Sequence, residues 1–245
     1  MANAKKVALI TGANKGLGFE MARQLGQAGV SVLMAARDPL KGEAAAAKLR
    51  DEGLDAQFLQ LEVTDPGDHA AASALLEKQF GRLDILINNA GISAEPLGSG
   101  KVSTTAGDTL RRTFDTNFFG PVALTQALLP LLKKSDAARI VNMSSILGSQ
   151  TLHADPKSPI YDFKSLSYDA SKAALNSFTI HLAHELKDTK IKVNSAHPGW
   201  VKTDMGTDAA PMEIPEGAKT GVALALLGDD GPTGGYFHLG KPLPW

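Results

Sequence analysis

A tyrosine and a lysine stand four residues apart in the second half of the chain. Tyr168 and Lys172 belong to the segment Tyr-Asp-Ala-Ser-Lys, and on a helix this spacing places both side chains on one face. A neighbouring ammonium favours the phenolate, so Lys172 is expected to lower the pKa of the phenol from its usual value of about 10. The pair could therefore carry a proton, although an isolated Tyr-x3-Lys pair is more often a surface pair.

Two further polar residues could act beside this pair. Ser145 comes just after the apolar stretch 139–143, where its hydroxyl could hydrogen-bond a carbonyl oxygen and stabilise developing charge. A serine at the end of a strand is, taken alone, more often a turn or cap residue. Asn117 precedes Gly120 and Pro121 within a helical segment, and its amide would need freed backbone groups or an ordered water as partners.

Glycines cluster near the N-terminus, between an apolar stretch and a helical one. Residues 11–18 read Thr-Gly-Ala-Asn-Lys-Gly-Leu-Gly, with glycine at Gly12, Gly16 and Gly18. Glycine is needed where a chain turns tightly and where its backbone approaches a pyrophosphate, and the following helix offers unpaired N–H groups to the anion. The spacing Gly-x3-Gly-x-Gly differs from the commonest dinucleotide fingerprint, and any tight strand-to-helix turn can use glycine. With a strand before it and a helix after it, this loop predicts a phosphate site.

The residue at the end of the second predicted strand distinguishes the two nicotinamide dinucleotides. An acidic side chain there binds the ribose 2′-hydroxyl of NAD, whereas a basic one suits the 2′-phosphate of NADP. Arg37 stands at that position, and Lys15 of the glycine loop can approach the same corner. Asp38 precedes Pro39 and is explained as the cap of the next helix. The two cations favour NADP, and the alternative is that Arg37 is a solvated charge.

These residues are distributed over an alternation of short apolar runs and helical segments, which is typical of a parallel sheet wrapped by helices. Seven strands are expected, at residues 7–10, 30–36, 56–61, 85–88, 139–143, 191–196 and 235–239. Helices are expected between them, including one over 108–134 that Gly120 and Pro121 should kink or split. We therefore predict an α/β fold, a single-domain Rossmann-type doubly wound sheet over residues 1–245 with helices on both faces. Long loops near 93–107, 146–166 and 202–215 follow successive strands and are expected to form the substrate rim.

The composition excludes several classes of site. The chain has 245 residues, no cysteine and a formal net charge of -1. It has no disulfide, thiolate metal site or cysteine nucleophile, and it offers no basic surface for nucleic acid or anionic lipid. The apolar run near the N-terminus is too short for a signal-peptide core or a membrane span, so a cytoplasmic location is expected. Five histidines lack the spacing of metal ligands and are interpreted as surface or packing residues: His153, His181, His184, His197 and His238.

Taken together and in this order, the motifs resemble those of the classical short-chain dehydrogenases/reductases, and the resemblance covers nearly the whole chain. The motifs are the glycine loop, Asn88-Asn89-Ala90-Gly91, Asn117, Ser145, Tyr168 with Lys172, and Pro198-Gly199. Local details in the glycine loop, around Arg37, and over residues 116–120 and 198–205 are most similar to the NADPH-dependent carbonyl reductase branch. The resemblance implies reversible reduction of a ketone or aldehyde to an alcohol, with NADP(H) as the cofactor.

The resemblance also implies a role for each matching residue. Tyr168 would be the general acid, and Ser145 would orient the substrate carbonyl. Lys172 would hold the nicotinamide ribose, and Asn117 would anchor the water of a proton relay. The residues that would bind the cofactor are Gly12, Asn14, Lys15, Gly16, Leu17, Gly18, Arg37, Glu62, Val63, Asn89, Ala90, Gly91, Tyr168, Lys172, Pro198, Gly199, Val201 and Thr203. Trp200 and Met205 would line the substrate pocket or else anchor a loop against the sheet.

Two departures from the family pattern are visible. Glu62 stands where the family usually has an aspartate near the adenine. Ser145 and Tyr168 are further apart than in most of the family, and a longer insertion at this place covers an assembly face in the monomeric carbonyl reductases. A homo-oligomer (dimer or tetramer) and a monomer are therefore both compatible with the sequence. Two other functions stay open, an NAD-dependent secondary alcohol dehydrogenase and a catalytically silent NADP-binding sensor or scaffold.

Overall fold

The computed structural model describes residues 5–98 and 100–245, and its centre is one sheet of eight strands in the order β3-β2-β1-β4-β5-β6-β7-β8. The strands are β1 (Val7–Thr11), β2 (Ser31–Ala36), β3 (Ala56–Gln60), β4 (Ile85–Asn88), β5 (Arg139–Met143), β6 (Lys192–Ala196), β7 (Tyr236–His238) and β8 (Lys241–Pro242). Neighbours from β3 to β7 pair in parallel, and β8 pairs antiparallel with β7. The strand order reverses between β1 and β4, which is where open α/β sheets bind ligands.

The central strands are buried on both faces because their sequences are almost continuously apolar. Every residue of β1, β2, β4 and β5 is buried, as expected for parallel strands with helices on both sides. All seven predicted strands are present. The sequence predicted about seven strands, and the sheet has eight. The additional strand, β8, has two residues, one of them a proline, so no alternating pattern could predict it.

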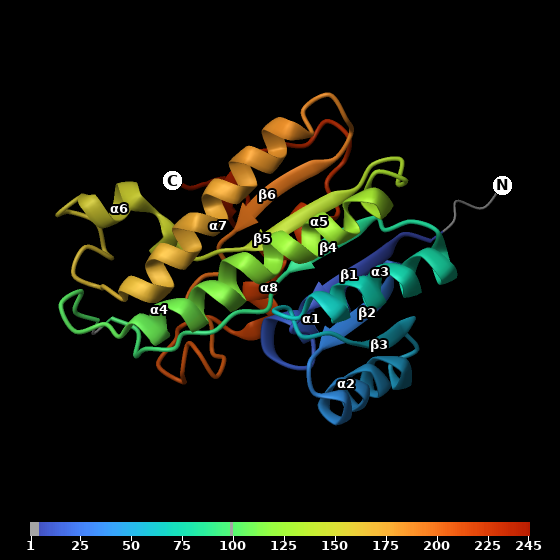
Figure 1. Cartoon of the computed structure of the whole chain (residues 1–245), viewed down its shortest axis with the longest axis horizontal. Helices are drawn as coiled ribbons and strands as arrows, with labels where there is room; N and C mark the ends of the chain where they lie inside the picture. The colour runs from blue at the N-terminus through green and yellow to red at the C-terminus, as the bar shows by residue number, and fades with distance from the viewer. Residues whose placement is uncertain (1–4, 99) are drawn as a thin grey trace.

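Helices cover both faces of the sheet (Figure 1). The helices of one face, which share one apolar core cluster, are α1 (Gly16–Gln27), α2 (Pro39–Asp51) and α8 (Ile214–Ala225). Those of the other face, around a second cluster, are α3 (Pro66–Phe80), α5 (Gly120–Leu132) and α7 (Leu166–Glu185). The predicted single-domain, doubly wound Rossmann-type fold is therefore confirmed. Within the described residues, none of these helices combines the length and apolarity that a membrane crossing requires.

The long helical segment 108–134 is interrupted one turn earlier than its sequence indicates. α4 (Gly107–Phe114) runs into a turn of π-helix, η1 (Asp115–Phe119), and then into α5. Gly120 and Pro121 were expected to kink or split the helix; they form the first residues of α5, directly after η1, and the Gly120 amide donates to the Asp115 carbonyl. The interruption is η1, which carries Asn117.

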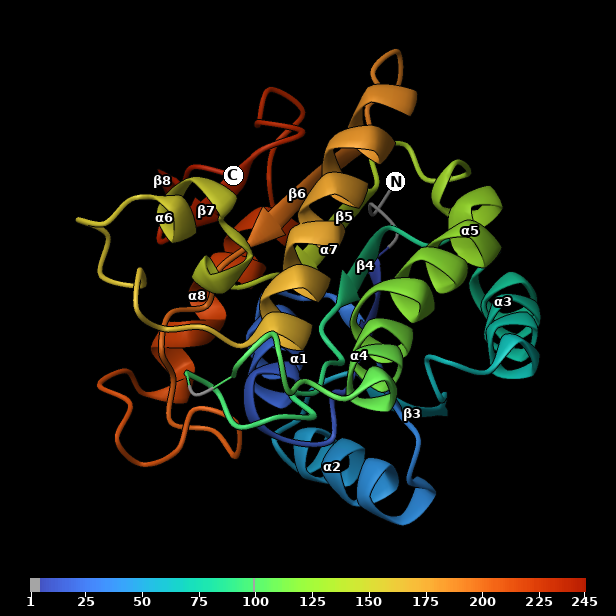
Figure 2. The same cartoon turned by 60° about the vertical axis from the view of Figure 1, so that its left-hand side comes forward.

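The long loops lie at one end of the molecule, beyond the carboxyl ends of the strands (Figure 2). The 146–166 segment is more than a loop, because it contains η2 (Ile146–Gly148) and α6 (Gln150–Ala154). The 202–215 segment is closed at its base by a bridge between Val201 and Met212, and its last two residues, which were predicted to be loop, begin α8.

Candidate active site

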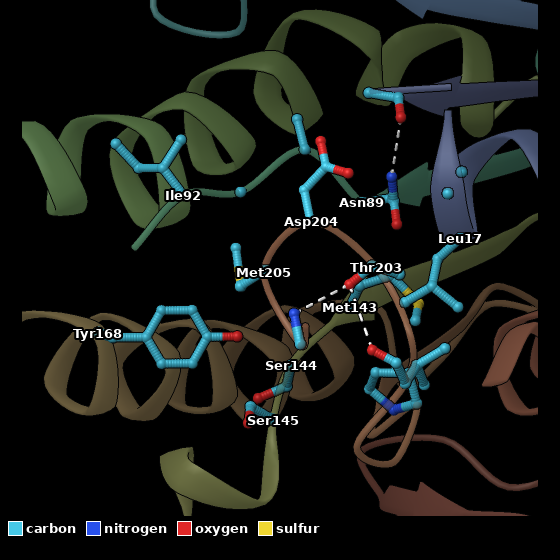
Figure 3. A pocket seen from close by; sticks show the side chains of 18 of the residues that line it. Leu17, Asn89, Ile92, Met143, Ser144, Ser145, Tyr168, Thr203, Asp204 and Met205 are labelled. Atoms are coloured by element: carbon cyan, nitrogen blue, oxygen red, sulfur yellow. Dashed lines mark hydrogen bonds between the residues drawn. The ribbon is translucent and has the colours of Figure 1, made fainter. Parts of the chain in front are cut away.

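One cavity of about 1160 Å³ opens at the carboxyl ends of the central strands. All the residues predicted from the sequence to contact cofactor or substrate line this cavity, from Gly12 to Met205. Of the predicted catalytic residues, only Asn117 lies behind its wall, where it is fully buried. Figure 3 shows Tyr168 pointing its hydroxyl into the cavity, toward the side on which Ser145 lies.

The glycine loop has a backbone geometry that other residues would strain. Gly12 and Gly16 adopt φ angles of 63° and 57°, in the left-handed region that favours glycine. A Cβ atom on Gly18 would collide with the carbonyl oxygen of Gly12, so the start of α1 can approach β1 this closely only with glycine there. The cap residue, Lys15, makes no side-chain bond to the first turn of α1. The amides of that turn are left for an anion, and the cradle fits the pyrophosphate of a dinucleotide.

The segment 88–91 fastens the end of β4 to its neighbours. Thr11 Oγ1 accepts hydrogen bonds from the amides of Asn89 at 2.9 Å and Ala90 at 3.0 Å, and Asn89 Nδ2 donates to the Thr11 carbonyl at 2.8 Å. Asn88 Nδ2 donates to Asn142 Oδ1 at 2.8 Å, which links β4 to β5. These bonds hold the floor of the cavity by short contacts between adjacent strand ends.

The two cations predicted to select NADP both have acidic partners. Arg37 Nη1 lies 3.8 Å from Glu62 Oε2, and Lys15 forms an ion pair with Asp204. Asp38 is occupied as the cap of α2, as predicted. The corner is therefore charge-balanced rather than simply cationic. Both cations are largely exposed, so these pairs are weak and each cation can exchange its partner for a phosphate group.

Tyr168 and Ser145 bring two hydroxyl groups together at the inner wall of the cavity. The Ser145 hydroxyl lies close enough to the phenol to oppose a rise in its pKa, and Tyr168 is only 7% exposed. Burial raises the pKa of Tyr168 to about 12 and outweighs the opposing effect of the Ser145 hydroxyl. The phenol is therefore protonated at neutral pH, which is the state that a proton donor needs. Ser145 Oγ also accepts from the Leu147 amide at 3.3 Å.

Lys172 lies beside Tyr168 on α7, as their spacing predicts. Its Nζ is 5.6 Å from the centre of the Tyr168 ring and donates to the carbonyl of Met143 at 2.8 Å. Burial lowers the pKa of Lys172 to about 8. The predicted net lowering of the Tyr168 pKa is wrong, because burial of the phenol raises this pKa more than its polar surroundings lower it.

Asn117 is held in η1 by three hydrogen bonds. Its Oδ1 accepts from the Ile92 amide at 2.9 Å, and its Nδ2 donates to the Ile92 carbonyl at 2.9 Å and to Ser171 Oγ at 3.0 Å. Gly91 lies between this side chain and Lys172, since a Cβ atom on it would be 3.4 Å from Asn117 Oδ1 and 3.5 Å from Lys172 Nζ. The amide and the ammonium therefore border one small space that glycine leaves open.

The other end of the cavity is apolar and is built from the long loops. Its buried cluster consists of Leu147, Ile160 and Tyr168, against which Leu97, Ile146, Leu152 and Met205 pack. Trp200 is 56% exposed at the rim, and its indole N–H donates to the Gly206 carbonyl at 2.8 Å. Met205 is thus part of the pocket wall. Trp200 lines the cavity and also stabilises its own loop through the hydrogen bond to Gly206.

His197 lines the cavity, although the sequence suggested only a surface or packing residue. It is 8% exposed, and its Nδ1 accepts from the amides of Ile146 at 3.2 Å and Gly199 at 3.4 Å. Burial, helped by His238, lowers the pKa of His197 to about 3, so the ring is neutral near pH 7. It joins the segment after β5 to the loop after β6. Its position directly before Pro198-Gly199 was the only local signal for this role.

Comparison with known proteins places this fold and cavity in a family. Residues 6–214 match the family described as short chain dehydrogenase. The chain belongs to the short-chain dehydrogenase family. The resemblance found in the sequence is thereby confirmed.

This short-chain dehydrogenase has well-covered relatives. It is 33% identical to carbonyl reductase (NADPH) 1 of Mus musculus, with 100% of both chains covered. It is 34% identical to a (+)-neomenthol dehydrogenase of Arabidopsis thaliana, with 95% of each chain covered. Among solved structures, it is similar to an NADPH-bound carbonyl reductase from chicken fatty liver, with a TM-score of 0.86 and 30% identity over 98% of this chain and 99% of that one.

The two departures seen in the sequence have clear places in this short-chain dehydrogenase. Glu62 Oε1 accepts from the Thr64 amide at 3.3 Å, which holds the carboxylate beside Arg37 at the cavity. The 146–166 insertion lies on the side of α7 away from α5 in both Figure 1 and Figure 2. Ile146, Leu147 and Ile160 of this segment line the apolar end of the cavity.

Proposed function

We propose that this chain reduces the carbonyl group of a ketone or aldehyde to an alcohol, reversibly, with NADPH as the hydride donor. The observation that carries the proposal is the pairing of the Tyr168 and Ser145 hydroxyls where the glycine-lined and apolar ends of one cavity meet. The relationship to carbonyl reductases supports the same reaction. The partner is a small carbonyl or alcohol compound.

The cofactor would lie along the carboxyl ends of the strands. The first amides of α1 would bind its pyrophosphate, and Arg37 and Lys15 would bind its 2′-phosphate. Glu62 and Val63 would border the adenine, and the segment 198–203 would border the nicotinamide. When bound, NADPH supplies the hydride for the carbonyl carbon. The chain itself would orient the substrate, exclude water and supply the proton.

Tyr168 would donate the proton to the carbonyl oxygen. Ser145 would hydrogen-bond the same oxygen and stabilise the negative charge that develops on it. Donation leaves a buried phenolate, which the Lys172 ammonium, 5.6 Å from the ring centre, would stabilise. That ammonium is present below its pKa of about 8.

The phenolate must regain a proton before the next turnover. The Lys172 ammonium would return a proton to the phenolate, which leaves a neutral amine. Lys172 and Asn117 border the space beside Gly91, and a water held there by Asn117 Oδ1 would then protonate that amine and draw a replacement proton from solvent. Asn117 is well suited to hold that water because its own position is set by backbone and hydroxyl partners.

The apolar end of the cavity favours an uncharged substrate. Its wall includes Leu97, Ile146, Leu147, Ile160 and Met205. Burying an unpaired carboxylate against such a wall is costly. We therefore expect apolar ketones and aldehydes to be better substrates than keto acids.

The proposal is tested by screening ketones, aldehydes and quinones with NADPH and with NADH, following oxidation of the cofactor. We expect faster oxidation of NADPH than of NADH, and faster reaction with apolar ketones than with keto acids. A preference for NADH would favour the NAD-dependent secondary alcohol dehydrogenase. Binding of NADPH without oxidation by any compound would favour the silent sensor or scaffold and would contradict the proposal.

A further inference from the structure

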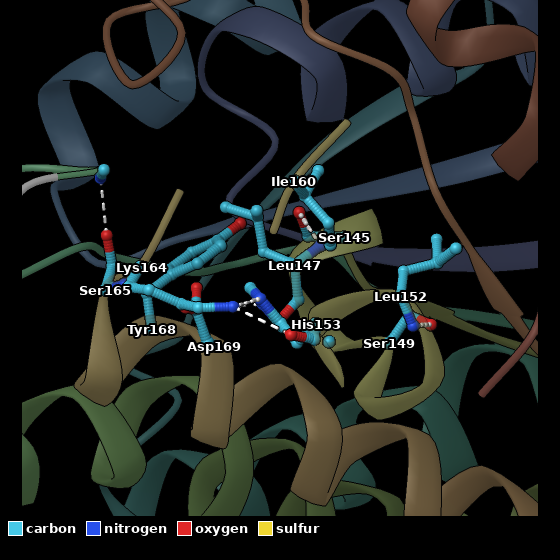
Figure 4. A network of polar contacts seen from close by, with 12 residues as sticks. Ser145, Leu147, Ser149, Leu152, His153, Ile160, Lys164, Ser165, Tyr168 and Asp169 are labelled. Atoms are coloured by element: carbon cyan, nitrogen blue, oxygen red, sulfur yellow. Dashed lines mark hydrogen bonds and ion pairs between the residues drawn. The ribbon is translucent and has the colours of Figure 1, made fainter. Parts of the chain in front are cut away.

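The helix that carries Tyr168 begins without a cap of its own. α7 starts at Leu166, so Tyr168 lies in its first turn, where amide groups lack partners within the helix. The cap residue, Ser165, makes no side-chain bond to the helix, and its Oγ instead accepts from the Gly98 amide at 2.7 Å. Figure 4 shows Ser165, Tyr168 and Asp169 at this helix start. Asp169 Oδ2 accepts the Ser165 amide at 2.8 Å but caps no amide of the first turn.

The missing cap comes from the 93–107 loop. Glu95 Oε1 accepts hydrogen bonds from the Ser167 amide at 2.6 Å and from the Ser167 hydroxyl at 2.5 Å. Ser167 is fully buried and immediately precedes Tyr168. A carboxylate at the N-terminus of a helix is stabilised by the free amides and by the helix dipole. A residue 72 positions earlier in the chain therefore holds the peptide that leads into Tyr168.

The same loop forms part of the substrate wall. Leu97, two residues after Glu95, lines the cavity and packs against the cluster of Leu147, Ile160 and Tyr168. The loop thus meets the start of α7 through the Glu95 carboxylate at the Ser167 amide, through the Gly98 amide at Ser165 Oγ, and through Leu97 at the apolar cluster. Of these contacts, the one made by Glu95 lies next to Tyr168 in the chain, and the one made by Leu97 shapes the pocket.

We propose that Glu95 is a positioning residue that sets Tyr168 relative to the substrate wall by holding the start of α7 against the 93–107 loop. The inference rests on the proposed function and deepens it, since it names the contact that links substrate selection to proton donation. Loss of the contact leaves every reacting group present but frees Tyr168 to move relative to Leu97. The effect should fall on kcat and on the order of substrates, and NADPH binding should be spared.

Three variants distinguish loss of the Glu95–Ser167 hydrogen bonds from loss of the Glu95 charge. Glu95→Ala removes the acceptor, Glu95→Gln keeps an acceptor oxygen without the charge, and Ser167→Ala removes one of the two donors. Glu77→Ala is the matched control, because Glu77 also accepts two hydrogen bonds, from Lys134, away from the cavity.

We expect Glu95→Ala to lower kcat at least about tenfold, since a displacement of about 1 Å can cost about a hundredfold in rate, while the Kd for NADPH stays within about twofold. Glu95→Gln should keep kcat within about threefold of the wild type, because the acceptor is retained. Glu95→Ala and Ser167→Ala should be non-additive when combined. Equal kcat values in Glu95→Ala and Glu77→Ala, or equal losses in Glu95→Gln and Glu95→Ala, would contradict the proposal.

Amide hydrogen exchange tests the contact without relying on activity. We expect faster exchange at the start of α7 and in residues 93–98 of Glu95→Ala, and wild-type exchange in Glu95→Gln and Glu77→Ala. Unchanged exchange at the start of α7 in Glu95→Ala would overturn the role of Glu95 even in an active enzyme. If the wild-type protein oxidises no cofactor with any carbonyl compound, the proposed function fails, and the exchange result still decides whether Glu95 holds α7.

Discussion

The two ends of the cavity are built from different kinds of structure. The cofactor end consists of strand ends and the start of α1, placed by the buried sheet and by short bonds such as that from Asn89 to Thr11. The substrate end consists of long loops held by side chains such as Glu95 and Leu97. Tyr168 stands where the two ends meet. Changes in the loops should therefore alter cofactor preference much less than substrate preference.

The largest loss of activity is expected from a substitution at Tyr168, where the cofactor end and the substrate end of the cavity meet. Tyr168→Phe removes the proton donor but keeps the ring, so kcat should fall roughly a thousandfold while NADPH binds with an unchanged Kd in a fluorescence titration. Near-normal turnover in this variant would mean that another group supplies the proton.

A change at the cofactor end should leave the substrate end intact. In Arg37→Asp, repulsion replaces a charge-assisted contact with the 2′-phosphate, so kcat/KM for NADPH should fall about 10- to 100-fold. The order of preferred ketones should stay the same. Arg111→Asp, which alters an exposed cation on α4 outside the cavity, is the control. A reordered set of substrates in Arg37→Asp would show that the two ends are not separate.

The pH dependence of reduction should report on Lys172. Burial lowers its pKa to about 8, so the ammonium is present below that pH and lost above it. Tyr168, with a pKa of about 12, does not titrate in this range. The rate of ketone reduction should fall by up to about tenfold per unit above pH 8. In Lys172→Met the rate of ketone reduction should be low and nearly independent of pH over the same range. A fall in rate above pH 8 that persists in this variant would show that another group titrates.

His197 hydrogen-bonds one segment at the substrate end and one at the cofactor end of the cavity. Its replacement should therefore affect the binding of both ketone and NADPH. His197→Leu deletes the acceptor for the Ile146 and Gly199 amides, and kcat should fall about tenfold with higher KM values for ketone and NADPH. His197→Asn, which keeps an acceptor near the Nδ1 position, should recover much of the rate. His181→Leu, at an exposed position, serves as the control. Equal losses in His197→Asn and His197→Leu would argue against the bonding role.

The smallest effect is expected at the exposed pair across the cofactor end. Asp204→Ala releases Lys15 for the 2′-phosphate, so the Kd for NADPH should fall, by less than about threefold because exposed ion pairs are weak. Isothermal titration measures it. A marked weakening of binding would mean that Asp204 itself holds the cofactor.

The cofactor end could be predicted from short stretches of sequence because its residues act through local backbone geometry. Gly12 and Gly16 need left-handed conformations, and Asp38 caps the helix that begins at the next residue. The apolar runs also predicted seven strands correctly, because each buried strand is marked by its own short apolar run in the sequence. Local patterns of this kind determine where the phosphate cradle lies.

The substrate end could not be predicted in this way because its contacts join distant residues. Glu95 binds Ser167 across 72 positions, and Ile146 binds His197 across 51. The pKa of Tyr168 was predicted in the wrong direction for a related reason. The spacing to Lys172 is visible in the sequence, whereas the burial that dominates the pKa depends on the packing of separate loops.

The central claim is that a hydride passes from NADPH to a carbonyl carbon in this cavity while Tyr168 protonates the oxygen. The most direct measurement uses NADPH deuterated at the transferable position of C4, an apolar ketone and mass analysis of the alcohol. The account predicts one deuterium at the carbinol carbon with the wild-type protein and almost none with Tyr168→Phe. Oxidation of the cofactor without label in the alcohol, or equal labelling by both proteins, would contradict it.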